Sequence, residues 1–240
     1  MLVRNANDSY PLWHDPICLR IVGVAAAQEQ FLRERLTQIF TQAGAAQGAP
    51  GCQANFHLIG SAHSAALIDA WINRNDHAGA AAPGWRRQAR RLAVPRPVRV
   101  WYDVYVVNAD GTPLGSACLG QSIGSEVPVS CDATATRLAF NQLARFDSLV
   151  MIVDLEQVAD FGLAQLADYI GFVGLTRVNL DAPLQGEPTV LSLFRVARED
   201  RPAGLTDWDR AFLSALYHTN PAVQGQEADI ARSMAVTLVH

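Results

Sequence analysis

Hydrophobic positions in the first part of the chain follow two different periods, one typical of a strand and one typical of a helix. Residues 17–24 (ICLRIVGV) are rich in β-branched side chains, which predicts a strand. Residues 29–43 place their apolar side chains at helical spacing, which predicts an amphipathic helix ended by Gly44. The residues of this apolar face are Leu32, Leu36, Ile39, Phe40 and Ala43.

The next stretch repeats the same order of elements. Residues 54–60 (ANFHLIG) alternate as in a second strand, and Ser61 is a candidate N-cap for a helix that extends to Asn73. A strand-helix-strand-helix order is typical of an α/β layer. We therefore expect at least two parallel strands, joined by a helical crossover.

The middle of the chain contains its most strand-like segment. Residues 84–92 (GWRRQARRL) predict a short basic helix or turn whose arginines form a solvated face. Residues 98–107 (VRVWYDVYVV) predict a strand, and 108–111 (NADG) is a hairpin-turn signal. The segment from Leu114 onward is then expected to return as the partner of that strand.

A buried strand followed by a long helix is predicted after the middle segment. Residues 132–145 fit either a helix or an irregular stretch, and the pattern does not decide between them. Residues 149–154 (LVMIVD) have the continuous apolar character of a buried strand. Residues 162–176 then predict a helix with an apolar stripe formed by Leu163, Leu166, Ile170 and Val173, with Ala167 and Gly174 at its edge.

Two further helices are predicted in the C-terminal part, over 206–217 and 227–239. Thr206 with Asp209 three positions later resembles a capping box. Together these elements predict an α/β (α+β) fold with a mixed sheet of about five strands, packed helices and a helical C-terminal part. Residues 1–16 are expected to form an irregular lead-in, and 17–240 a single domain.

Composition narrows the possible functions. Half of the 240 residues are apolar, but no stretch approaches the roughly 18 consecutive apolar residues of a transmembrane helix. The net charge is −4 without a long basic run, which argues against a nucleic-acid partner. All the basic side chains except histidine are arginines, so a Schiff base, a phosphate-loop lysine and a Ser-Lys dyad are excluded.

The four cysteines suggest a compartment. Cys18, Cys52, Cys118 and Cys131 are too widely spaced for a zinc site of paired CxxC motifs. We favour two disulfides, Cys18–Cys52 and Cys118–Cys131, over four buried thiols, although four cysteines allow three pairings. Such bridges predict a periplasmic or secreted protein. The first residues lack the apolar core of a signal peptide, so either a leader has been removed or the protein is cytosolic.

Two glycine-rich motifs occur in the same stretch. Gly120-Gln121-Ser122-Ile123-Gly124 matches the GxSxG motif of serine hydrolases, and Asp154 and His218 follow in the order Ser, Asp, His. The strand before the serine and the helix after it that this motif requires are not predicted, so a serine esterase is kept as the alternative function. Residues 115–122 (GSACLGQS) also resemble a phosphate-binding loop, but Gln121 replaces its lysine, which excludes that site.

The histidines do not predict a metal site. None of the six forms a pair four residues apart on a predicted helix. His57 lies in a predicted strand and His63 at the start of a helix, so only the tertiary fold could bring them to a common metal. We expect no metal and no cofactor.

The predicted helix at 162–176 has the setting, but not the residues, of a zinc peptidase helix. In HExxHxxG enzymes two histidines one turn apart bind zinc, the glutamate is the general base, and the glycine lets the chain turn or pack closely. The register that ends at Gly171 places Ala164, Gln165 and Asp168 at those three positions. One carboxylate cannot hold a catalytic zinc, which needs about three protein ligands.

Several segments resemble a family of uncharacterised exported proteobacterial proteins that are related to zincin-like metallopeptidases. They are 17–24, Cys52-Gln53-Ala54-Asn55, 96–102 (RPVRVWY), the IVD that ends at Asp154, 163–175, 188–194 (PTVLSLF) and 205–221. The resemblance implies a zincin-like arrangement in which the helix has lost both metal ligands and base.

The expected function is therefore that of an exported, non-catalytic protein, a pseudoenzyme. The cleft beside the 162–176 helix is expected to hold an unidentified peptide or protein partner. A purely structural envelope protein is a further alternative, which the absence of such a cleft would favour.

Overall fold

A computed structural model of the protein describes residues 10–79, 85–109, 111, 142–222 and 225–239. Its strands are β1 (Leu19–Val22), β2 (Phe56–Ser61), β3 (Val98–Asn108) and β4 (Gln142–Asp154). Its α-helices are α1 (Ala26–Ala43), α2 (Ser64–Gly79), α3 (Trp85–Ala93), α5 (Leu163–Leu175), α6 (Asp207–His218) and α7 (Gln226–Val239). Two short 3₁₀ helices, Val190–Ser192 and Arg198–Asp200, lie between α5 and α6.

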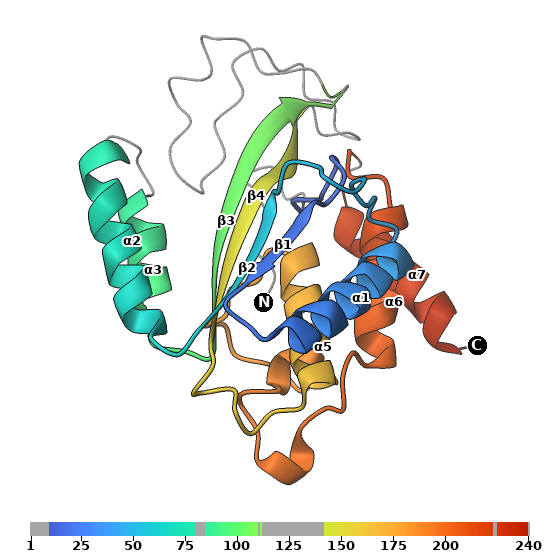
Figure 1. Cartoon of the computed structure of the whole chain (residues 1–240). Coiled ribbons are helices and arrows are strands. Elements are labelled where there is room, and N and C mark those ends of the chain that lie inside the picture. Colours follow the sequence, from blue (N-terminus) through green and yellow to red (C-terminus); the bar gives the residue numbers. More distant parts are fainter. Residues whose placement is uncertain (1–9, 80–84, 110, 112–141, 223–224, 240) are drawn as a thin grey trace.

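The strands form one mixed sheet in the order β1-β2-β4-β3 (Figure 1). β1, β2 and β4 are parallel, with Leu19 opposite Phe56 and Phe56 opposite Leu149, whereas β3 runs antiparallel to β4. The mixed α/β class and the parallel strands are thus confirmed. The described residues contain four sheet strands in place of about five, and they give no support to a zincin-like arrangement.

The hairpin prediction for β3 is tested only at its turn. The turn itself is present, since the Gly111 amide donates to the Asn108 carbonyl oxygen at 2.8 Å and Gly111 has a φ of +86°. The strand, however, pairs along its length with β4, from Val98 opposite Val153 to Asn108 opposite Gln142. The 13 residues of β4 are long enough to pair with β3 along one side over its whole length. The expected partner from Leu114 onward lies outside the described residues.

Helices cover both faces of the sheet. α1 and α5 pack on one face with α6 and α7 behind them, and α2 and α3 lie on the other (Figure 1). Alternate residues of β4 supply the two cores, because successive side chains of a strand point to opposite faces. Leu149, Met151 and Val153 join the larger core, whereas Ile152 packs with Ile68, Leu92 and Trp101 under α2 and α3.

The segment before β1 is irregular but packed. Trp13 is buried, its indole nitrogen donates to the Gly174 carbonyl oxygen at 2.8 Å, and its ring lies 5.2 Å from that of Phe146. Tyr10 is also buried, and its hydroxyl donates to Glu227 on α7 at 3.2 Å. The predicted domain boundary at residue 17 stays a prediction, and these residues before it share the same core.

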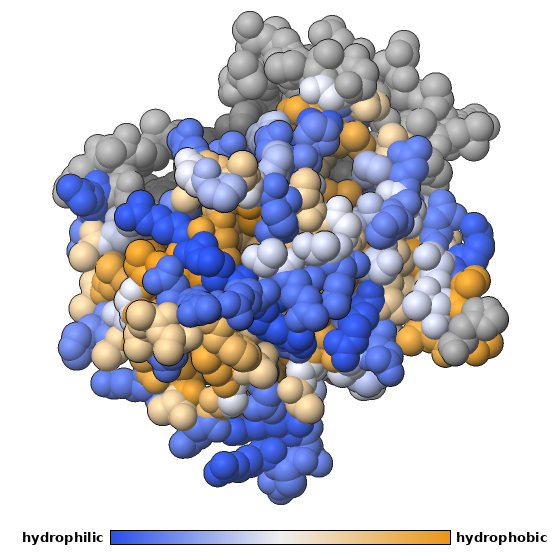
Figure 2. All heavy atoms as spheres, turned by 45° about the vertical axis from the view of Figure 1, so that its right-hand side comes forward, coloured by the Kyte–Doolittle hydropathy of each residue, from blue (hydrophilic) through white to orange (hydrophobic). Residues whose placement is uncertain are grey.

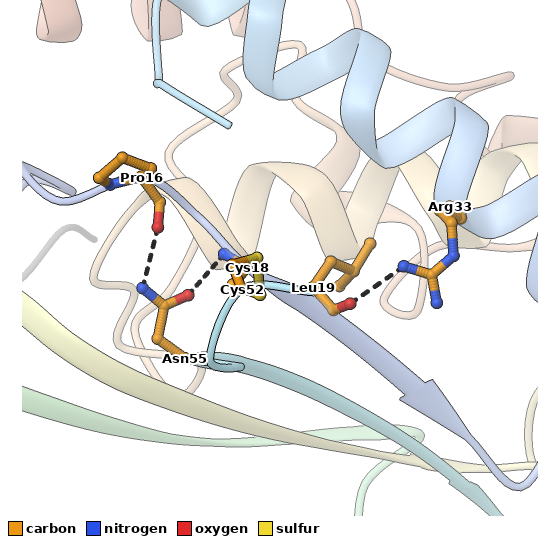
Figure 3. Close-up of a disulfide and its surroundings, with 6 residues drawn as sticks. All are labelled: Pro16, Cys18, Leu19, Arg33, Cys52 and Asn55. Carbon is orange, nitrogen blue, oxygen red and sulfur yellow. Dashed lines mark hydrogen bonds between the residues drawn. A yellow bond between two sulfur atoms is a disulfide. The ribbon is translucent and has the colours of Figure 1, made fainter. Parts of the chain in front are cut away.

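A disulfide between Cys18 and Cys52 joins the start of β1 to the loop before β2 (Figure 3). Asn55 supports the same corner, since its side chain accepts from the Cys18 amide at 2.7 Å and donates to the Pro16 carbonyl oxygen at 3.1 Å. This bridge was predicted and is confirmed. Cys118 and Cys131 lie outside the described residues.

The surface on the side of α1, α6 and α7 carries both hydrophobic and hydrophilic residues. Figure 2 shows hydrophobic patches separated by hydrophilic residues on this side. Exposed apolar residues include Val236, Leu238 and Val239 at the end of α7. None of the described helices combines the length and the apolar character needed to cross a membrane.

Candidate functional site

Helix α5 forms where it was predicted and lies at the centre of the larger core. It begins after Gly162 and every residue from Leu166 to Leu175 is buried. Its apolar stripe packs on the sheet and on α1, because Leu166, Ile170 and Val173 recur at helical spacing. The chemistry of this helix therefore depends on its few polar side chains.

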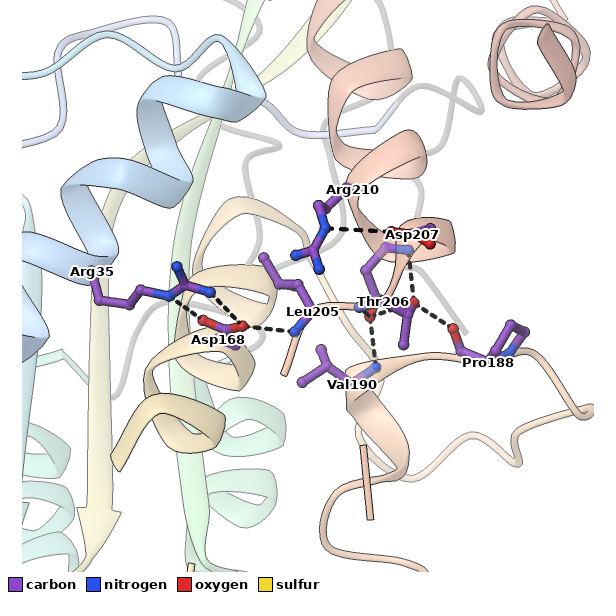
Figure 4. Close-up of polar contacts among 9 residues, drawn as sticks. Arg35, Asp168, Pro188, Val190, Leu205, Thr206, Asp207 and Arg210 are labelled. Atoms are coloured by element: carbon purple, nitrogen blue, oxygen red, sulfur yellow. Dashed lines mark hydrogen bonds and ion pairs between the residues drawn. The ribbon is translucent and has the colours of Figure 1, made fainter. Parts of the chain in front are cut away.

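Asp168 is the charged residue of α5, and its carboxylate is fully engaged (Figure 4). It is 2% exposed, and Arg35 of α1 donates to its two oxygens at 2.6 and 2.9 Å. The Leu205 amide donates to Oδ2 at 2.7 Å. An added Cβ on Gly204 would lie 2.3 Å from the same oxygen, so the loop backbone closes over the carboxylate. Asp168 thus ties α1, α5 and the loop before α6 together.

The other positions of the zinc-peptidase register serve packing and capping. Gln165 accepts from the Gly162 amide at 3.1 Å and donates to the Pro202 carbonyl oxygen at 2.7 Å, whereas Ala164 is exposed. A Cβ on Gly171 would lie 2.9 Å from Ile39 of α1, so the two helices meet at closest approach there. Among the described residues, no group of His, Cys, Asp and Glu could hold a metal ion.

Asp154, a candidate of the hydrolase alternative, ends β4 in a polar cluster. The Ser64 hydroxyl donates to its Oδ2 at 2.6 Å, and the backbone and side chain of Gln157 donate at 3.1 and 2.8 Å. Burial raises the pKa of Asp154, but these hydrogen bonds outweigh it, so the pKa lies below its ordinary value. Arg99 donates to the Ser64 hydroxyl at 3.3 Å.

His218 lies far from this cluster. It ends α6, its Nδ1 is 2.7 Å from the Ser214 carbonyl oxygen, and its ring lies against Gly44 at the end of α1. α1 leads from the carboxyl end of β1 back to the start of β2, while Asp154 pairs with Ser61 at the end of β2. The two residues therefore lie at opposite ends of the sheet. Ser122 lies outside the described residues, and the hydrolase alternative stays a prediction.

The opposite side of α5 borders an apolar pocket, which we call the strand-end pocket. Its volume is about 240 Å³. It lies where the parallel strands β1, β2 and β4 end, the position at which open α/β sheets bind ligands. It is lined by Val24, Gln28, Leu32, Leu58, Gly60, Val153, Leu155, Val158, Ala159, Phe161, Leu163, Leu166 and Ile170.

The rim of the strand-end pocket is held by its own contacts. Phe161 packs edge-on against Phe194, with ring centroids 4.8 Å apart, and the Arg201 guanidinium lies 3.9 Å from the centre of the Phe161 ring. Such aromatic and cation–π contacts fix the ring in place. Gly60 lets β2 approach Gly23, because a Cβ there would lie 2.9 Å from the Gly23 carbonyl oxygen.

A cleft beside this helix was expected, but the residues that line it were not predicted, because they come from three separate stretches of the chain, 24–32, 58–60 and 153–170. A usable signal was the loop between β4 and α5, where apolar Leu155, Val158 and Phe161 follow a strand end. Apolar side chains at the carboxyl ends of parallel strands suggest a binding crevice, provided the strand order is known.

Comparisons with known proteins find no match for this chain among family models, curated proteins or solved structures.

Proposed function

We propose that this chain is an exported, non-catalytic binding protein whose strand-end pocket holds one large apolar side chain of a peptide or protein partner. The observation that carries the proposal is the position of this pocket beside α5 at the ends of three parallel strands. Open α/β sheets place ligands at this edge, and apolar concave sites are typical of ligand binding.

The polar residues of α5 support a non-catalytic role. A general base must reach its substrate, but Asp168 is buried under Gly204 and paired with Arg35. Gln165 has no basic carboxylate, and its amide is bonded to the backbone of Pro202. The proposal includes the resemblance to zincin-like proteins, in which Ala164, Gln165 and Asp168 would stand at the ligand and base positions.

The size of the pocket indicates its occupant. Sites for whole drug-sized ligands enclose roughly 300–1,000 Å³, and the strand-end pocket, at about 240 Å³, is smaller. It has room for one aromatic or branched aliphatic side chain, the kind of anchor that dominates many protein interfaces. Gln28 is the one polar side chain among its described lining residues, so a charged group would be poorly solvated there.

The disulfide supports an oxidising compartment. Bridges persist in oxidising compartments and are rare in the cytosol, and the Cys18–Cys52 bridge closes a 34-residue separation. A periplasmic or secreted location is therefore part of the proposal.

N-acetylphenylalaninamide is a suitable probe for the pocket, because it presents an uncharged benzyl group on a peptide-like backbone. We expect saturable shifts of the methyl resonances of Val158, Leu163 and Leu166 in methyl-labelled protein. Full burial of one such side chain contributes about 1.5–3 kcal/mol, so the dissociation constant should be about 6 mM or weaker.

Two matched variants test the location. Ala159→Trp fills the pocket from its exposed rim and should abolish the shifts, whereas Ala66→Trp on α2 should leave them intact. N-acetylglycinamide, which lacks the side chain, should give no saturable shift. The proposal is wrong if the pocket methyls do not respond to the benzyl probe, or if both tryptophan variants respond alike.

A further inference from the structure

A second pocket lies at the edge of the sheet, between α3, the start of β3 and the segment after α5. We call it the arginine pocket, because four of its lining residues are arginines. Its full lining is Gln88, Arg91, Arg96, Arg99, Val100, Tyr102, Arg177, Val178, Asn179, Leu180 and Asp181. It is separate from the strand-end pocket and shares no residue with it.

The charge of this pocket is strongly unbalanced. Arg99 and Arg177 are 3% and 7% exposed, and the side chain of Arg96 is 16% exposed. Asp181 is the one carboxylate among the described lining residues, and it is bound to Arg96 at 2.7 Å with a side chain that is 57% exposed. Four arginines and one largely solvated carboxylate thus line the pocket, and the charges that attract Arg99, those of Asp154 and Asp69, belong to residues outside this lining. Because positive charge exceeds negative charge within the lining, such a pocket favours an anionic ligand.

One arginine that lines the pocket has an unsatisfied donor. The Nε of Arg96 is buried and has no hydrogen-bond partner in the described part of the chain. Buried donors are nearly always bonded, and an unsatisfied one points to an ion or water at that position. Burial lowers the pKa of Arg99; the charge of Asp154 opposes this effect and that of Arg96 adds to it. An anion between the two arginines would relieve their mutual repulsion.

From these contacts we infer that the arginine pocket binds a small oxyanion of the phosphate type, either free or as the terminal phosphate of a larger ligand. The pocket volume is about 50 Å³, and a water needs roughly 10–15 Å³ in the same measure, so only a small group fits. Planar guanidinium groups bind phosphate oxygens bidentately, which matches the chemistry of the lining. This inference does not rest on the proposed function.

Isothermal titration calorimetry of the full chain with sodium phosphate, at constant ionic strength, tests the inference. We expect saturable binding of one phosphate per chain, and a shift of the Arg96 Nε–H resonance in the same titration. Sodium acetate, with one charge and a planar group, should bind at least about fivefold more weakly.

Three variants locate the site. Arg91→Gln removes an exposed arginine of the pocket mouth and should weaken phosphate binding about tenfold, since a charged hydrogen bond is lost. Arg90→Gln makes the same charge change at the next residue of α3, which does not line the pocket, and should change affinity less than twofold. Asp181→Asn removes the competing carboxylate and should strengthen binding about two- to fivefold, a gain that unfolding cannot produce.

A second ligand distinguishes binding of free phosphate from binding of the terminal phosphate of a larger molecule. If phenyl phosphate binds as well as inorganic phosphate, the site takes the terminal phosphate of a larger molecule; if only inorganic phosphate binds, it takes the free ion. Both results support the inference. No saturable phosphate binding by the wild type, or equal losses in Arg90→Gln and Arg91→Gln, would overturn it.

Discussion

Asp168 shows how a buried charge can be structural in a position that suggests catalysis. Its carboxylate receives three hydrogen bonds, two from Arg35 and one from the Leu205 amide, and these come from separate segments of the chain. In the sequence, its spacing from Gly171 matches that of the second zinc-binding histidine in an HExxHxxG helix. Its partner Arg35 is 133 residues away, so no local pattern could indicate the pair.

Asp168→Ala should lower the free energy of unfolding by about 2–3 kcal/mol. Breaking a buried pair typically costs about 3–5 kcal/mol, and the 31% exposure of the Arg35 side chain lets water solvate the charge left behind. Urea denaturation followed by tryptophan fluorescence measures the change. Asp229→Ala on α7 removes a partly exposed aspartate paired with the exposed Arg232 and should cost less than about 1 kcal/mol. Equal losses would show that the Asp168 pair has no special role.

The Asp154 cluster predicts an acid-dependent part of the stability. Because the folded-state pKa lies below the unfolded value, the native state binds fewer protons, and the stabilisation is complete above the unfolded pKa. It is lost as pH falls from about 4 through the folded pKa. Ser64→Ala removes the donor at 2.6 Å, raises the pKa of Asp154, and should flatten the loss of stability between pH 5 and pH 2.

Urea denaturation at several pH values compares Ser64→Ala with the wild type. Ser214→Ala on α6, whose carbonyl but not hydroxyl contacts His218, serves as the control and should keep the wild-type slope. A slope unchanged by Ser64→Ala would mean that the hydroxyl does not set this pKa.

At the scale of single elements, the predicted boundaries of α5 and α6 agree closely with the observed ones, whereas the helix predicted from an N-cap at Ser61 to Asn73 spans Ser64–Gly79. The helix expected at 162–176 spans 163–175, and the one expected at 206–217 spans 207–218. The capping box predicted for Thr206 and Asp209 is present, as is the left-handed Gly44 that ends α1. These features depend on residues a few positions apart, and so the sequence displays them directly.

Glycines in α5 illustrate a packing constraint that helix propensity does not show. A Cβ on Gly174 would lie 2.4 and 2.5 Å from atoms of the Phe56 ring of β2. Although alanine favours a helix by up to about 1 kcal/mol, overpacking a core costs typically 1–3 kcal/mol. Gly174→Ala should therefore destabilise the protein by about 1–2 kcal/mol in urea denaturation.

The control for Gly174→Ala is the reverse change at an exposed position of the same helix. Ala164→Gly removes no packing and should cost about 0.5–1 kcal/mol from propensity alone. A Gly174→Ala variant more stable than the wild type would show that α5 can move away from β2 at little cost.

At the scale of the whole molecule, the Cys18–Cys52 bridge should contribute about 3–4 kcal/mol, because it restricts an unfolded chain over 34 residues. The double variant Cys18→Ser/Cys52→Ser, measured by urea denaturation, should show this loss. As a control, adding reductant to the double variant shows how much reduction elsewhere in the chain changes the free energy of unfolding. Stability equal to that of the wild type would mean that the bridge does not constrain the unfolded state.

The arrangement of the strands in the sheet was harder to predict from the sequence than the strands and helices themselves. The apolar alternation of β3 and the turn at Gly111 indicated a hairpin, but they did not indicate that β3 pairs with β4, which begins at Gln142. The start of β4 was not recognised, because Gln142, Arg145 and Asp147 interrupt its apolar pattern. Partner choice in a sheet depends on which faces are buried together, and that is a property of the assembled core.

The sequence by itself determined the α/β class, the boundaries of α5 and α6 and the caps at Thr206 and Gly44, and it favoured the first disulfide, since each follows from side chains close in the chain or few in number. Only the tertiary structure decided the strand order, the pairing of Asp168 with Arg35, and the two pockets. The local periodicity of apolar residues indicates whether a side chain is buried, but it does not indicate which other side chain it packs against. Both candidate binding sites arise from contacts between distant segments, and these form only when the sheet and its helices come together.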